Sequence, residues 1–298
     1  MDIIESTAIK LSNASLKKLY NPFNRITYQE LVPGQLQFPE QLISIFHEEE
    51  YANLTQAKKA HLSLLEMVNF FSMNIYGEQS LIREFESRLY RNKSSAEGYD
   101  ASRYMQHFIH EENSHTFMLS EYCHKYAGFI YRNRTLEIPR QDISFEAQEL
   151  LMYGRTIVLE RFLAYLNARA CHDHALGQTT RDCNRAHLID EVRHIAWDRE
   201  VISFYRSELV RNSRYEEINL VIQALNDYLE TAFHMLYNPR CYQSVLLSNP
   251  LELVRKAKEN PKRDNSIREW VDSVKDELFN LNMILSIDGR EELEKSNL

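Results

Sequence analysis

The amino-acid sequence predicts an all-α protein built on a four-helix bundle, with additional helices toward both ends. Seven glycines and seven prolines are spread over 298 residues, so long stretches contain nothing that ends a helix. Apolar side chains recur at helical spacing over four long segments. A 44% apolar composition can fill a large core, and we expect residues 1–298 to form one domain.

The bundle helices are expected at about 54–92, 96–126, 144–174 and 181–212. In the first of them, Leu64, Phe71 and Phe85 belong to a seven-residue repeat of apolar side chains, and Glu78 occupies the remaining position of that repeat. This repeat keeps one face of a helix turned toward the core. Gly128 is placed to end the second helix, because a glycine commonly follows the last helical turn.

The remaining elements follow from residues that begin or end helices. Gly177 would close the third helix, and Thr179 or Thr180 can cap the fourth. Residues 1–40 predict a short helix followed by irregular chain that wraps the domain. Residues 215–297 predict two or more accessory helices. Breaks between these helices are expected near Pro239, Pro250 and Pro261.

Charge and cysteine usage indicate the partners and the compartment. A net charge of −8 argues against a nucleic-acid groove or an anionic membrane surface as partner, since both need clustered lysine and arginine. The sequence shows neither a signal peptide nor an apolar run of membrane-spanning length. The four cysteines lack the spacing of zinc or redox motifs and fit reduced thiols. We therefore expect a cytoplasmic protein whose partners are small molecules or proteins.

Four glutamates and two histidines recur in a fixed order along the four predicted helices. They are Glu78, then Glu112-Asn-Ser-His115, then Glu160, then Glu191-Val-Arg-His194. Helical bundles that bind two iron ions take one Glu from each of two helices and a Glu-x-x-His pair from each of the other two. The order therefore predicts a carboxylate-bridged di-iron site and oxygen chemistry.

The signal lies in the pair of motifs on separate helices. A chain of this composition contains about one Glu-x-x-His by chance. A third match, Glu121-Tyr-Cys-His124, lies nine residues beyond Glu112. Nine residues are about 900° of helix rotation, so this match faces outward as a surface pair. Glu66 and Glu84 lie off the apolar stripe of the first helix.

Carboxylates within apolar stripes need a partner. The choices are a paired cation, a raised pKa or a metal, because an isolated buried charge is costly. Few lysines or arginines face inward on these segments, which favours a metal. Carboxylate and imidazole donors suit iron, and four glutamate charges offset the four positive charges of a diferrous pair. Zinc would prefer fewer carboxylates.

Three neighbours of the second motif each have two interpretations. Asp190 and Arg193 complete an Asp-Glu-x-Arg-His sequence, in which the Asp usually accepts a hydrogen bond from a ligating histidine and the Arg holds the carboxylates. The alternative is an exposed salt bridge one turn apart. His187 lies four residues before Glu191 and shares its face, so it is either an additional nitrogen ligand or a hydrogen-bonded core histidine.

The ordered set resembles the p-aminobenzoate N-oxygenase family of non-haem di-iron oxygenases. Members carry His-x-x-x-Glu-x-x-His on the fourth ligand helix, and this chain has His187-Leu-Ile-Asp-Glu191-Val-Arg-His194. The resemblance extends over about Leu64–Ile202 and implies a ferritin-like bundle. It implies metal roles for Glu78, Glu112, His115, Glu160, His187, Glu191 and His194, with Asp190 and Arg193 hydrogen-bonded behind them.

The resemblance also implies a reaction and its partners. Members activate O2 at two reduced iron ions and oxidise an arylamine, which requires an external electron donor, either a protein or a small reductant. We expect N-oxygenation of a small amine, free or bound to a carrier protein, and a possible homodimer. Two alternatives remain: a hydroxylase or desaturase with another substrate, and a ferritin-type protein that oxidises iron for storage.

Overall fold

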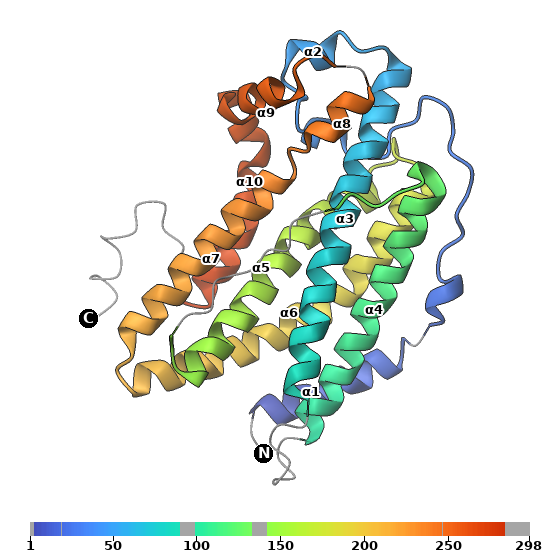
Figure 1. The fold of residues 1–298 in the computed structure, drawn as a ribbon. Coiled ribbons are helices and arrows are strands. Elements are labelled where there is room, and N and C mark those ends of the chain that lie inside the picture. Colours follow the sequence, from blue (N-terminus) through green and yellow to red (C-terminus); the bar gives the residue numbers. More distant parts are fainter. Residues whose placement is uncertain (1–2, 19, 90–98, 133–141, 246, 284–298) are drawn as a thin grey trace.

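The computed structural model describes residues 3–18, 20–89, 99–132, 142–245 and 247–283. Four long helices form its centre: α3 (Gln56–Arg88), α4 (Tyr99–Ala127), α5 (Phe145–His172) and α6 (Gln178–Arg211). They lie side by side in Figure 1, with α3 and α6 running one way and α4 and α5 the other. The four predicted bundle helices are confirmed, and their described ends agree with the predicted ones to within four residues. Residues 90–92 and 96–98 of the predicted helices lie outside the described residues.

Local capping explains where these helices begin and end. The Thr55 hydroxyl accepts a hydrogen bond from the Lys58 N–H at the start of α3. At the start of α5, the Ser144 hydroxyl accepts one from the Ala147 N–H. Gly128 follows α4 with φ +82°, and its N–H donates to the carbonyls of Cys123 and His124. The predicted glycine end of this helix is confirmed, because this left-handed backbone favours glycine.

The predicted role of Gly177 was wrong. Helix α5 already ends at His172, and Gly177 is the residue before α6. Its N–H donates to the Leu36 carbonyl, and a Cβ there would overlap the Gln37 side chain. Glycine fits this position because the buried Gln37 side chain, which accepts a hydrogen bond from Thr180, approaches closely.

The threonines after Gly177 do not cap α6 either. Thr179 and Thr180 lie inside its first turn and are buried. The Thr180 hydroxyl donates to Gln37 Oε1, and the Thr179 hydroxyl accepts from the Gln29 N–H. Both side chains therefore bind the N-terminal segment to the bundle instead of satisfying the helix end.

The N-terminal segment crosses the bundle and then follows it lengthwise. Helix α1 (Ile3–Leu16) packs on α4 and α6, and η1 (Pro22–Asn24) lies against α4. Extended chain then runs beside α4 toward η2 (Glu40–Leu42) and α2 (Glu49–Ala52), as Figure 1 shows. This is the expected short helix followed by irregular chain. Apart from one bridge between Leu36 and Leu176, the regular elements of the described residues are helices.

The C-terminal third covers α5. Helix α7 (Tyr215–Met235) lies along α5, followed by α8 (Pro239–Ser244), α9 (Pro250–Glu259) and α10 (Pro261–Asn280), which also packs on α5. The last three helices each begin at a proline, where its fixed φ and missing N–H cost nothing. The predicted breaks are confirmed, and residues 284–297 of the predicted accessory region lie outside the described residues.

One cluster of buried apolar side chains extends from α1 through the bundle to α10. No described helix is both long enough and apolar enough to cross a membrane. Trp270 of α10 is fully buried, stacks on Phe162 of α5 with ring centroids 4.8 Å apart, and donates its indole N–H to the Phe162 carbonyl at 2.8 Å. We propose on this basis that the C-terminal helices belong to the same domain as the bundle.

Replacing Trp270 by alanine tests this proposal. We expect the free energy of unfolding to fall by about 3–5 kcal/mol, because a large buried ring is lost. Urea unfolding followed by circular dichroism should still give a single transition. Phe279, which is 63% exposed on the same helix, provides the control, and Phe279→Ala should change stability little. A separate early transition for the C-terminal helices would show two domains.

Candidate metal centre

The seven predicted ligand residues converge in the centre of the bundle. Helix α3 brings Glu78, α4 brings Glu112 and His115, α5 brings Glu160, and α6 brings His187, Glu191 and His194. Each of these residues is at most 1% exposed. The side chains come from four helices that are far apart in sequence, so the bundle itself fixes their positions.

Their donor atoms fall into two groups, each compact enough for one metal ion. Glu78, His115 and His187 form the first group; Glu112, Glu160, Glu191 and His194 form the second. Within each group the donor atoms lie within 4.8 Å of one another. Glu191 joins the two groups, since its Oε1 lies 2.7 Å from His187 Nε2 and its Oε2 lies 3.4 Å from His194 Nδ1. A carboxylate so placed can bridge two ions.

The histidine rings are oriented by hydrogen-bond partners behind them. His115 Nε2 lies 3.1 Å from Asp190 Oδ2, and His194 Nε2 lies 3.0 Å from Glu111 Oε2. Both rings therefore turn Nδ1 toward the glutamates. His187 is reversed: its Nε2 lies 3.1 Å from Glu78 Oε1. Outer partners of this kind fix the tautomer and direction of a metal-binding imidazole.

The donor atoms fit a metal because they lack hydrogen-bond partners. Buried polar atoms are normally hydrogen-bonded, and each exception needs an explanation. The unpartnered atoms include donors from all seven predicted ligand residues: both carboxylate oxygens of Glu78, Glu112 and Glu191, Glu160 Oε2, His115 Nδ1, His187 Nε2 and His194 Nδ1. Oxygen and imidazole nitrogen in this number are the donors that paired first-row metals take.

The charges lead to the same conclusion. In the described part of the chain, the ion pairs of the four glutamates involve only histidines, with no lysine or arginine. Without a metal, burial and the charges of Glu112 and Glu191 raise the pKa of Glu78 well above its usual value. Burial also raises the pKa of Glu191.

Two histidines respond to this charge in opposite directions. Burial lowers the pKa of His194, but the charges of Glu191 and Glu112 outweigh burial and hold it well above its usual value. Burial and the neighbouring His115 push the pKa of His187 well below its usual value. Protons therefore provide part of the positive charge that metal ions would provide.

Comparison with known proteins identifies the family. The model of the family of p-aminobenzoate N-oxygenase AurF matches residues 4–280. The chain belongs to this family. A search of curated protein sequences gives no match to this chain.

The AurF-family chain also resembles solved structures of R2-like ligand-binding oxidase variants that hold a Mn/Fe cofactor. One, reconstituted anaerobically, is 14% identical with a TM-score of 0.57 over 93% of each chain. Another, reconstituted aerobically, is 15% identical with a TM-score of 0.53 over 95% of this chain and 94% of the other. At such identity they confirm the fold, a ferritin-like helical bundle. With the family match, the protein is an oxygenase with a dimetal centre.

Asp190 and Arg193 are buried in this AurF-family bundle, so the alternative of an exposed salt bridge does not describe them. Arg193 Nη2 lies 2.7 Å from Asp190 Oδ1. Arg25 from the N-terminal segment lies 2.6 Å from Asp190 Oδ2, and the Tyr20 hydroxyl donates to the same oxygen at 2.9 Å. Although burial alone would raise it, the pKa of Asp190 is held far below its usual value by His115 and Arg25.

Sequence reasoning missed Glu111 and Arg25. Glu111 accepts from His194 and from Arg193, whose Nη2 lies 2.7 Å from its Oε1. These contacts outweigh burial and lower the pKa of Glu111 to about 2. A signal was present, since each Glu-x-x-His is preceded by an acid and each acid bonds the histidine of the other motif. Arg25 carried no such signal, because its position depends on how the N-terminal segment crosses the bundle.

The other acidic candidates lie away from the cluster. Glu121 and His124 are exposed, as expected for a surface pair. Glu66 is buried but accepts hydrogen bonds from the Ser44 N–H and hydroxyl, and Glu84 pairs with Arg88 on the surface. Their predicted positions off the metal-facing stripe are confirmed.

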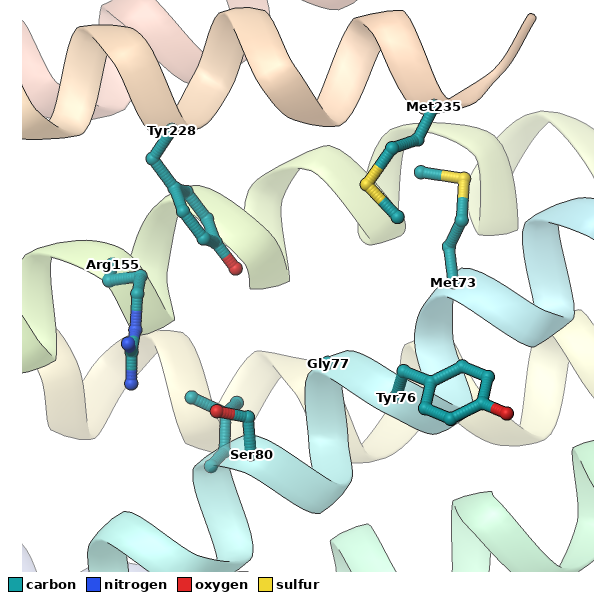
Figure 2. Close-up of a pocket in the computed structure, with 8 residues that line it drawn as sticks. Met73, Tyr76, Gly77, Ser80, Arg155, Tyr228 and Met235 are labelled. Carbon is teal, nitrogen blue, oxygen red and sulfur yellow. The ribbon is translucent and has the colours of Figure 1, made fainter. Parts of the chain in front are cut away.

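A pocket opens beside the cluster, between α3, α5 and α7. It encloses about 310 Å³ of empty space, part of it open to solvent. Figure 2 shows Met73 and Met235 facing each other at one end and Arg155 at the other. Gly77 lies in its wall, and the next residue is Glu78. A Cβ at Gly77 would be 2.8 Å from Leu159 Cδ2, so glycine lets α3 and the Leu159 side chain of α5 pack closely here.

Metal loading of the AurF-family protein should release protons. At neutral pH the metal-free protein keeps protons on groups with raised pKa, chiefly Glu78 and His194, and metal ions must displace them. The apparent metal affinity should weaken as pH falls. Titration calorimetry with Mn²⁺ in buffers of different ionisation enthalpy measures the release, which we expect to be on the order of one to two protons.

A matched pair of variants assigns this release. Glu78→Gln removes one carboxyl group whose pKa is raised, so it should reduce the number of protons released. Glu84→Gln changes a carboxylate outside the cluster on the same helix and should leave the number unchanged. Equal heats of binding in all buffers would contradict the proposed charge balance.

Proposed function

We propose that this protein is a di-iron N-oxygenase that converts a small arylamine to its hydroxylamine and further oxidised products. The observation that carries the proposal is the set of seven buried donors, on four helices, whose metal-facing atoms lack hydrogen-bond partners. Membership of a family named for p-aminobenzoate N-oxygenation supports the choice of substrate.

The donor set supports iron over other metals. Four carboxylates balance two divalent ions, and three imidazoles give iron the nitrogen donors that it takes readily. When bound and reduced, the pair would supply electrons for O2 reduction. The balanced first step is amine, O2, two electrons and two protons giving hydroxylamine and water, so an external electron donor is required. The isolated, buried cysteines fit work in the cytoplasm.

The chain's own residues would prepare the site for this reaction. Asp190 and Glu111 keep His115 and His194 turned inward, while the apolar bundle excludes bulk water from the cluster. The pocket beside Gly77 is the proposed entrance for the substrate, because its walls are mainly apolar and Arg155 lies at one end.

The decisive experiment loads the protein anaerobically with Fe(II), counts metals, and adds O2 and a reductant to a panel of amines. We expect two irons per chain and O2 consumption coupled to loss of an arylamine, with products identified by mass spectrometry. Glu160→Ala should abolish turnover, and Glu121→Ala, an exposed change, should not. Products hydroxylated at carbon or desaturated would favour the alternative oxygenases, and many irons per chain would favour storage.

Arg155 should select substrates that carry an anionic group. It is the cation among the residues that line the pocket, and its pairing with Glu84 is long, at 3.8 Å, while Glu84 has a closer partner in Arg88 at 2.6 Å. Its charge is therefore available to a ligand. We expect Arg155→Met to raise KM for an aminobenzoate about 10- to 100-fold and to leave KM for uncharged arylamines nearly unchanged.

Arg83→Met gives the matched control, since Arg83 is an exposed arginine of α3 outside the pocket. Arg83→Met should change neither KM for an aminobenzoate nor KM for uncharged arylamines. If Arg155→Met raised KM equally for charged and uncharged arylamines, its effect would be on packing, and the assigned selection would be wrong.

A further inference from the structure

Three asparagines are fully buried near the metal cluster: Asn74 on α3, Asn167 on α5 and Asn184 on α6. The side-chain oxygen of each lacks a hydrogen-bond partner. Asn74 and Asn184 donate their amide N–H groups to backbone carbonyls one turn earlier in their own helices. Asn167 differs, because its Nδ2 lies 3.0 Å from Nδ1 of His187. Only this one of the three contacts a predicted ligand.

The Asn167 amide faces the ring nitrogen of His187 that points away from the glutamates. The other ring nitrogen, Nε2, faces Glu191 Oε1 at 2.7 Å and Glu78 Oε1 at 3.1 Å. Either atom of an asparagine amide can face a ring nitrogen, because a 180° turn exchanges the oxygen for the nitrogen in nearly the same volume.

Metal binding through Nε2 requires the neutral tautomer of His187 that carries its proton on Nδ1. That proton points at the Asn167 amide and needs an acceptor. The Asn167 side-chain oxygen has no other hydrogen-bond partner, so it can accept from Nδ1–H when it faces the ring.

We propose that Asn167 is the positioning residue of His187, with its side-chain oxygen accepting from the Nδ1–H of the ring. This contact fixes the tautomer that presents Nε2 to the group formed by Glu78, His115 and His187, as Asp190 and Glu111 do for the other two histidines. The inference rests on the dimetal site proposed above. It gives His187 a neutral hydrogen-bond partner, Asn167, where His115 and His194 have the charged partners Asp190 and Glu111. A neutral acceptor leaves the imidazole a weaker donor than a carboxylate would.

Four variants test this role. Asn167→Leu removes both acceptor and donor, and Asn167→Asp keeps only the acceptor. Asn74→Leu and Asn184→Leu are the matched controls, since they remove equally buried amides that bond backbone carbonyls of their own helices. We expect Asn167→Leu to weaken binding of one of two Zn²⁺ ions about 10- to 100-fold, Asn167→Asp to restore it, and both controls to bind two ions as the wild type does.

Nitrogen-15 NMR of the histidine rings gives a readout that packing alone would not move. In the Zn²⁺-loaded wild type, the Nδ1 of His187 should carry a proton that exchanges slowly. His187→Gln assigns the signals. In loaded Asn167→Leu that proton should exchange fast.

The outcomes separate this inference from the proposed function. Failure of the wild type to bind two ions would remove the proposed function and with it this inference. Two ions in the wild type and undiminished affinity in Asn167→Leu would overturn the role of Asn167 alone. An unprotonated Nδ1 in the loaded wild type would do the same.

Discussion

Four glutamates that share one buried site repel one another, and this repulsion constrains the rest of the structure. Each carboxylate is at most 1% exposed and makes no ion pair with lysine or arginine in the described chain. Fixed cations are absent from the centre, so protons or metal ions must compensate the charge. The bundle tolerates these carboxylates because two divalent ions neutralise them together, and this requirement explains why all four helices contribute at once.

A second layer of charge surrounds the first and is neutralised within the protein. Asp190 and Glu111 orient His115 and His194, and Arg193 lies 2.7 Å from both acids. Arg25 completes this layer from a segment that precedes the bundle in sequence. The N-terminal segment therefore does more than cover the core. It brings the Arg25 cation to Asp190, which also accepts hydrogen bonds from His115 and Tyr20.

Local patterns in the sequence predict the helices and the inner ligands, because both depend on spacing within single helices. Glu78 lies in a seven-residue apolar repeat, and each Glu-x-x-His places two donors on one face. The contributions of Arg25, Gly177 and Asn167 depend on which segments meet in space. No periodicity within a segment encodes such meetings. Glu111 is an intermediate case. It precedes Glu112 as Asp190 precedes Glu191, so the symmetry between the two motifs indicates its role although its partner His194 lies on another helix.

The two halves of the cluster are chemically unequal. One offers three carboxylates and one imidazole; the other offers one carboxylate and two imidazoles, with Glu191 reaching both. A divalent ion in the carboxylate-rich half would be over-neutralised, and one in the histidine-rich half would keep positive charge. The imidazoles of His115 and His187 are neutral donors, so the residual charge there would be offset only by Glu78 and by the share that Glu191 contributes. The unequal division of carboxylates between the halves therefore makes the two positions electrostatically distinct.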